Sequence, residues 1–135
     1  MRGIADTGLL VAFANRRDVH HEWALGVVEQ ITEPLLTCEA VLAETAFHLG
    51  DVSLVLDMRE TGLVELGFDI GLHWRRLREL AGSYADRRPD LADLCLVCMS
   101  ELFPDHDVIT VDESDFRIYR RNKREVIPLI CPPRQ

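Results

Sequence analysis

Two aspartates stand where apolar, strand-like segments of the sequence end. Asp6 follows Gly3-Ile4-Ala5, and Asp112 follows the β-branched run from Val108 to Val111. Such a run is typical of a strand buried on both faces of a parallel sheet. In open α/β sheets, ligands bind beyond the carboxyl ends of the strands, so acids at these positions point to a site. The simpler interpretation is that Asp112 caps the following helix.

Two further acids lie in apolar stretches that resemble the buried sides of helices. Glu44 lies within Ala40 to Phe47, and Asp93 follows Leu91-Ala92, with Asp90 one turn earlier on the same face. An ionised carboxylate in such surroundings is costly without a partner, and these segments contain no basic residue. If the fold brings the acids together, they repel one another strongly unless a cation neutralises them.

Hard divalent cations supply that neutralisation. Mg²⁺ and Mn²⁺ prefer carboxylate oxygens and keep open positions for water and phosphate. Two such ions about 4 Å apart activate a water molecule and stabilise the leaving oxygen of a phosphodiester. The chemistry that these acids favour is therefore metal-assisted hydrolysis.

The elements that must position the acids alternate between strands and helices. Asp18 is expected to cap the second helix, and Thr37 the third. We expect strands at 2–5, 35–36, 63–66, 108–111 and 127–130, and helices at 9–15, 20–31, 39–49, 52–59, 69–84, 90–103 and 115–121. This alternation predicts an α/β fold with a mainly parallel sheet flanked by helices.

Length and composition favour one globular domain, 1–135. A chain of 135 residues buries roughly two thirds of the surface that it exposes when unfolded. Its hydrophobic share of 47% and charged share of 28% are ordinary for a globular protein. No apolar run approaches the roughly 20 residues that span a bilayer, and Asp6 interrupts the N-terminus before a signal-peptide core forms. We therefore expect a cytoplasmic protein with no membrane partner.

The net charge of −8 argues against binding nucleic acid by bulk electrostatics. It leaves room for a nuclease whose site is loaded with divalent cations. A basic run, 117–124, directly follows the Asp112 segment. Two interpretations stay open for this run: it is a solvated helix face, or it contacts RNA phosphates through Arg117, Arg120 and Arg121.

Cysteines and histidines point to chemistry less strongly than the acids. Cys95 and Cys98 are spaced as Cys-x-x-Cys, but no second pair stands at zinc spacing. Helical spacing places both on an apolar stripe that also holds Leu91 and Leu102, so we interpret them as buried small hydrophobes. We interpret His20 as a surface or helix-packing residue, and His48, which has no acidic or cysteine partner at metal spacing, as a structural one.

The order of the acidic segments resembles the PIN-domain family. The segments are Ile4-Ala5-Asp6-Thr7, Val41-Leu42-Ala43-Glu44-Thr45, Asp90-Leu91-Ala92-Asp93 and Thr110-Val111-Asp112-Glu113-Ser114-Asp115-Phe116. The likeness covers nearly the whole chain and is closest to the VapC-type ribonucleases of bacterial toxin–antitoxin pairs. Glu113-Ser114 departs from the pattern, because a basic residue is common there in relatives.

This resemblance implies a three-layer α/β/α fold and an endoribonuclease that depends on Mg²⁺ or Mn²⁺ and uses metal-activated water. It also implies a homodimer and a small antitoxin that blocks the site. The catalytic, metal-binding quartet would be Asp6, Glu44, Asp93 and Asp112. Asp90 and Asp115 would be accessory metal-binding acids, and Thr7 and Thr110 would be hydroxyl groups beside the substrate.

Two other functions compete with this hypothesis. One is a catalytically inactive module whose acidic pocket docks a basic peptide or partner protein, and Mn²⁺ affinity distinguishes it from a nuclease. The other is a phosphatase of the haloacid dehalogenase type. That fold requires a second acid two residues after Asp6, where this chain has Gly8, and a later lysine, whereas the only lysine is Lys123.

Overall fold

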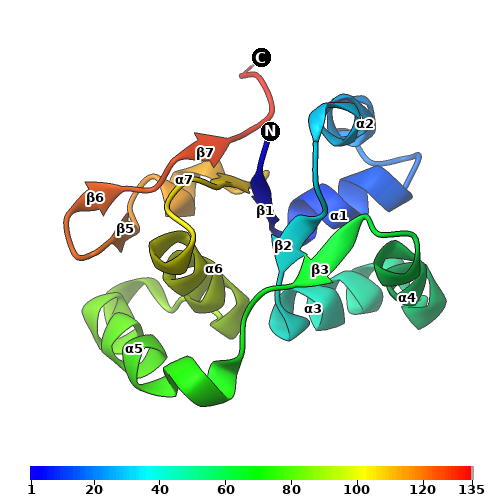
Figure 1. Ribbon diagram of the computed structural model, residues 1–135. Helices are drawn as coiled ribbons and strands as arrows, with labels where there is room; N and C mark the ends of the chain where they lie inside the picture. The colour runs from blue at the N-terminus through cyan, green and yellow to red at the C-terminus, as the bar shows by residue number, and fades with distance from the viewer. Residues whose placement is uncertain (135) are drawn as a thin grey trace.

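A five-stranded parallel sheet forms the centre of the computed structural model, which describes residues 1–134 (Figure 1). Gln135, the last residue of the predicted domain, lies outside the described residues. The strand order is β3-β2-β1-β4-β7, and the central pairings join Ile4 to Leu36 and to Val108. The strands are β1 (Gly3–Ala5), β2 (Leu35–Thr37), β3 (Val64–Leu66), β4 (Asp107–Ile109) and β7 (Leu129–Ile130).

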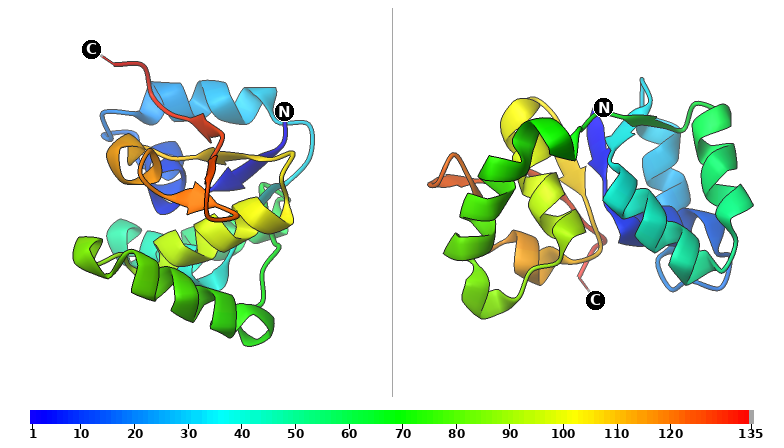
Figure 2. Two further views of the ribbon diagram at one scale, coloured as in Figure 1. Left: turned by 90° about the vertical axis from the view of Figure 1, so that its left-hand side faces the viewer. Right: turned by 90° about the horizontal axis from the view of Figure 1, so that it is seen from below.

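Helices cover both faces of this sheet. In Figure 2, α2 lies on one side of the strands, and α5 and α6 lie on the other. The helices are α1 (Thr7–Ala14), α2 (His21–Gln30), α3 (Glu39–Leu49), α4 (Val52–Glu60), α5 (Ile70–Ser83), α6 (Leu91–Leu102) and α7 (Glu113–Phe116), with a 3₁₀ turn at Ala85–Arg87. The predicted three-layer α/β/α fold is confirmed. Within residues 1–134, no helix combines the length and the apolar composition needed to cross a bilayer.

Helix α6 is the most deeply buried helix, and it contacts both β1 and β4. Cys95 and Cys98 are buried and unpaired, as expected for small hydrophobes. The predicted stripe is wrong at its two ends, because Leu91 and Leu102 are exposed. Burial of α6 along nearly its whole length fixes the position of its first turn, which holds Asp93.

The predicted helix at 115–121 is wrong. Helix α7 ends at Phe116, and β5 (Arg120–Arg121) pairs antiparallel with β6 (Glu125–Val126). Positive φ at Asn122 and Lys123 turns the chain back on itself, so Arg120 and Arg121 pair as a strand where the last helical turn was predicted.

Two predicted caps are also wrong. Thr37 is the last residue of β2, and its hydroxyl donates to the Ala5 carbonyl oxygen, so Cys38 takes the N-cap position of α3. Asp18 accepts a hydrogen bond from the backbone N–H of His20, and α2 begins only at His21.

Candidate metal centre

Three aspartates of the predicted site are the N-caps of three helices. Asp6 accepts from the N–H of Thr7 at 2.7 Å, and Asp90 accepts from the N–H of Asp93 at 2.8 Å. Asp112 accepts from the N–H of Asp115 at 3.3 Å. A helix N-terminus favours negative charge. The capping interpretation is therefore correct, and it aims the starts of α1, α6 and α7 at one region.

That region is a cavity of about 310 Å³ beyond the carboxyl ends of β1 and β4. It gathers side chains from segments that are far apart in the sequence. Six residues of the predicted site line it: Asp6, Thr7, Glu44, Asp90, Asp93 and Asp112. The other lining residues are Gly8, Val11, Asp18, His20, His48 and Val111.

The tightest group of carboxylates is Asp93, Asp112 and Asp115. One oxygen from each lies within 4.8 Å of the others, and all three side chains are half-buried. Asp115, predicted as an accessory acid, thus belongs to the same group as two of the quartet. Its Oδ1 also accepts from the Arg87 guanidinium at 2.9 Å.

Hydroxyl groups hold the carboxylates in place. Thr110 Oγ1 donates to Asp6 Oδ2 and accepts from the Asp112 N–H at 2.9 Å. Thr7 Oγ1 donates to Glu44 Oε2 at 3.1 Å. The hydroxyls of Thr7 and Thr110, expected beside the substrate, are thus directed at acids of the site.

Burial and mutual repulsion destabilise the ionised forms of Asp6, Asp93 and Asp112. Burial, together with Asp112 and Asp90, raises the pKa of Asp6 to about 6, against the opposing hydrogen bonds from Thr110 and Thr7. Burial, together with Asp90, Asp6 and Asp112, raises the pKa of Asp93 to about 8. The pKa of Asp112 is also raised, chiefly by burial.

The donor set fits a divalent cation. Within residues 1–134, no Lys or Arg forms an ion pair with Asp6, Glu44, Asp93 or Asp112. Carboxylate oxygens are the ligands that Mg²⁺ and Mn²⁺ prefer, and a bound cation would offset the repulsion that adds to burial in raising the pKa of Asp6, Asp93 and Asp112.

The arginines predicted to contact RNA lie outside the cavity lining. Arg117 pairs with Glu113 at 3.3 Å and is exposed. A guanidinium nitrogen of Arg120 donates to backbone carbonyls, including that of Arg117. The Arg121 guanidinium is largely buried and donates to the Pro104 carbonyl. Two of these three side chains are therefore engaged in holding the fold together around β5.

Sequence reasoning missed three polar residues of the cavity wall: Asp18, His20 and His48. One signal was available, because His48 follows Glu44 by one helical turn and so shares its face of α3. Asp18 and His20 belong to the α1–α2 connection, whose path toward the site depends on tertiary packing.

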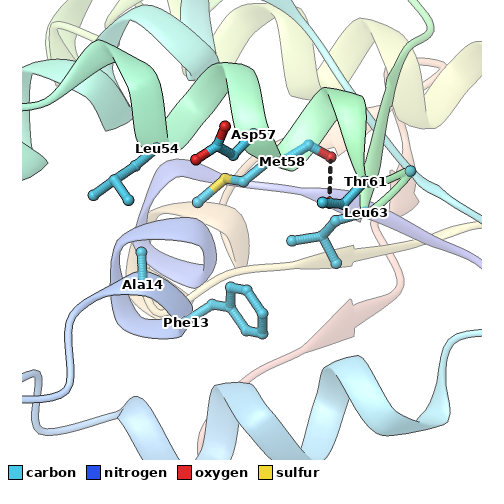
Figure 3. A pocket seen from close by; sticks show the side chains of 8 residues that line it. Phe13, Ala14, Leu54, Asp57, Met58, Thr61 and Leu63 are labelled. Carbon is cyan, nitrogen blue, oxygen red and sulfur yellow. Dashed lines mark hydrogen bonds between the residues drawn. The ribbon is translucent and has the colours of Figure 1, made fainter.

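A larger hollow of about 560 Å³ lies between the end of α1 and α4. Figure 3 shows Phe13, Leu54, Met58 and Leu63 directed into it. Asp57 is the one acid in its lining. A mostly apolar wall with a single carboxylate does not fit a hard cation, so size alone does not identify the chemical site.

The comparison with protein-family models agrees with this geometry. The family model described as "PIN domain" matches residues 4–122. No curated protein matches the chain.

Proposed function

The chain belongs to the PIN-domain family, whose members are generally metal-dependent nucleases, and from that premise we propose that it is a divalent-metal-dependent endoribonuclease. One observation carries the proposal. Six acids line one cavity, and no Lys or Arg of the described chain lines it. Such a site needs cations, and cations at an open cavity suit the hydrolysis of an anionic phosphodiester.

Asp93, Asp112 and Asp115 are the residues that would hold the first Mg²⁺ or Mn²⁺. Asp6, Glu44 and Asp90 line the cavity together with Asp93 and Asp112. When bound, the metal supplies a Lewis acid that activates water and offsets phosphate charge. The side chains of this protein orient the ligands: Thr110 fixes Asp6, and Thr7 fixes Glu44.

Cleavage of RNA tests the activity. We expect the purified protein to cut RNA in Mg²⁺ or Mn²⁺ and to stop in excess chelator. Asp93→Asn and Asp112→Asn should abolish cleavage. Asp69→Asn is the matched control, because Asp69 caps α5 outside the cavity and its loss should leave activity intact.

Two outcomes would contradict the proposal. Cleavage that persists in chelator or in both site variants excludes the mechanism. Absence of Mn²⁺ binding together with tight binding of an arginine-rich peptide would favour the inactive docking module instead.

We further propose that the protein is a VapC-type toxin that forms a homodimer and is blocked by a small antitoxin. The proposal is supported by family membership and by the order of the acidic segments. Growth arrest on expression, relieved by the small protein encoded next to it, is the expected result. Light scattering should give the mass of two chains, and a monomer with no effect on growth would contradict this assignment.

A further inference from the structure

We propose that His20 and His48 bind the RNA phosphodiester inside the acidic cavity, an inference that rests on the ribonuclease function proposed above. The two imidazoles would donate hydrogen bonds to phosphate oxygens. This assigns them as substrate-binding residues and not as metal ligands.

The charge of the cavity is the first argument. Six of the residues that line the cavity are acids. Among the described residues of the lining there is no Lys or Arg. A phosphate that enters therefore meets negative charge on most sides. Cations held by Asp93, Asp112 and Asp115 would offset part of that charge. The hydroxyl of Thr7 is occupied by Glu44, so the two imidazoles are the remaining side chains of the wall that carry N–H donors.

The placement of the two histidines is the second argument. His48 lies one turn after Glu44 on α3, and α3 packs beside α6, which holds Asp93 (Figure 1). His20 is the N-cap of α2. The backbone N–H of His20 donates a hydrogen bond to Asp18 Oδ1 at 2.8 Å, which fixes the backbone there. The histidines thus come from α2 and α3, whereas Asp93, Asp112 and Asp115 come from α6 and α7.

The free ring nitrogens are the third argument. The His20 ring packs edge-on against Trp23, with centroids 6.3 Å apart, and the His48 ring packs in the same way against Phe47 at 5.7 Å. Neither ring has a hydrogen-bond partner among residues 1–134. By contrast, His21 Nδ1 lies 2.7 Å from the Ala12 carbonyl oxygen. Trp23 thus contacts the His20 ring, the His48 ring is exposed beside an exposed Phe47, and the N–H donors of both imidazoles stay available.

The test compares His20→Ala, His48→Ala and His48→Gln with the wild-type protein. We expect each alanine variant to raise KM for a short single-stranded RNA of random sequence about tenfold, the usual effect of losing one hydrogen bond to a charged group. The kcat should stay near the wild-type value, because binding is weakened equally in ground and transition states. His48→Gln retains an N–H donor and should restore most of the affinity.

Two controls separate this role from a structural or metal-binding one. His73→Ala removes a histidine that stacks on Phe68 outside the cavity, and it should leave KM unchanged. Mn²⁺ affinity by calorimetry should be the same in the wild type and in both alanine variants.

Each contrary outcome has a separate meaning. Unchanged KM in the alanine variants overturns the inference and leaves the ribonuclease function standing. Weaker Mn²⁺ binding in them overturns it by making the histidines metal ligands. A wild-type protein that cleaves no RNA in either metal removes the ribonuclease function and this inference together.

Discussion

The hydroxyl of Tyr119 donates a hydrogen bond to Asp93 Oδ2 at 3.0 Å. Tyr119 is buried, and its ring packs edge-on against Phe116 and Tyr84. The bond links the segment after α7 to the first turn of α6. A fixed aromatic hydroxyl therefore sets the orientation of a proposed metal ligand.

Tyr119→Phe should weaken Mn²⁺ binding by about tenfold or more, because partners that orient metal ligands typically contribute that much. The free energy of unfolding should fall by about 1 kcal/mol for the lost hydrogen bond. Calorimetric titration with Mn²⁺ and urea unfolding measure the two effects. Tyr84→Phe, which removes a hydroxyl that accepts from the Arg120 N–H, is the control and should keep the Mn²⁺ affinity. Equal affinity in the Tyr119 variant and the wild type would show that Asp93 needs no such support.

Asp93→Asn should stabilise the metal-free protein increasingly as the pH rises. The folded pKa of Asp93 is about 8, above its unfolded value, because of burial and of Asp90, Asp6 and Asp112. Between roughly pH 4 and pH 8 the folded state therefore binds more protons than the unfolded state, and stability falls as the pH rises. Asparagine does not titrate, so the Asp93→Asn variant should not lose this stability as the pH rises.

The gain in the free energy of unfolding of Asp93→Asn should be near zero at about pH 4 and roughly 1–3 kcal/mol at about pH 8. This figure is reduced for the solvent screening of a partly exposed group. Urea unfolding of the metal-free wild type and variant across this pH range measures it. A gain in the Asp93 variant that does not grow with pH would contradict the raised pKa.

Gly8→Ala should damage the metal centre. A Cβ at Gly8 would overlap Val111 Cγ2, and Val111 precedes Asp112. Alanine favours a helix by about 1 kcal/mol over glycine, whereas overpacking costs about 1–3 kcal/mol. We expect a small net loss of stability and weaker Mn²⁺ binding. Gly26→Ala in α2, where a Cβ meets nothing within 4 Å, should instead stabilise the protein. Gain of stability with full Mn²⁺ affinity in the Gly8 variant would show that Val111 yields freely.

Arg87→Gln should tighten Mn²⁺ binding. Arg87 holds Asp115 Oδ1 at 2.9 Å, so its charge competes with a cation for that carboxylate. The free energy of unfolding should hardly change, because an ion pair that is only half-buried is screened by solvent and contributes little. Arg117→Gln is the matched control, since it breaks an exposed pair with Glu113 outside the cavity lining. Weaker Mn²⁺ binding in the Arg87 variant would mean that the arginine orders Asp115 for the metal.

Local pattern was enough to single out several acids that line the cavity. Asp6 follows an apolar strand and Asp93 lies in an apolar helix, and both features are visible in a few neighbouring residues. The three-layer fold follows equally from alternating strand and helix patterns. The residues that cap helices were harder to predict. Thr37 has a side chain that is common at N-caps, yet its hydroxyl donates to the Ala5 carbonyl oxygen on the neighbouring strand.

Contacts between distant segments were beyond the reach of sequence patterns. Tyr119 follows Asp93 by 26 residues, and the bond between them depends on how the chain turns after α7. The run 117–124 has the composition of a solvated helix. Arg120–Arg121 nevertheless forms β5, where the Arg121 guanidinium donates to the Pro104 carbonyl. His20 reaches the cavity only because α2 packs against α1.

The central claim is that carboxylates from distant segments form one cation site. Anomalous diffraction from crystals soaked in Mn²⁺ tests it most directly, because the signal locates the metal itself. We expect a peak among the carboxylate oxygens of Asp93, Asp112 and Asp115, and no such peak in Asp112→Asn crystals. A well-ordered cavity without a peak, or Mn²⁺ bound only elsewhere on the protein, would contradict it.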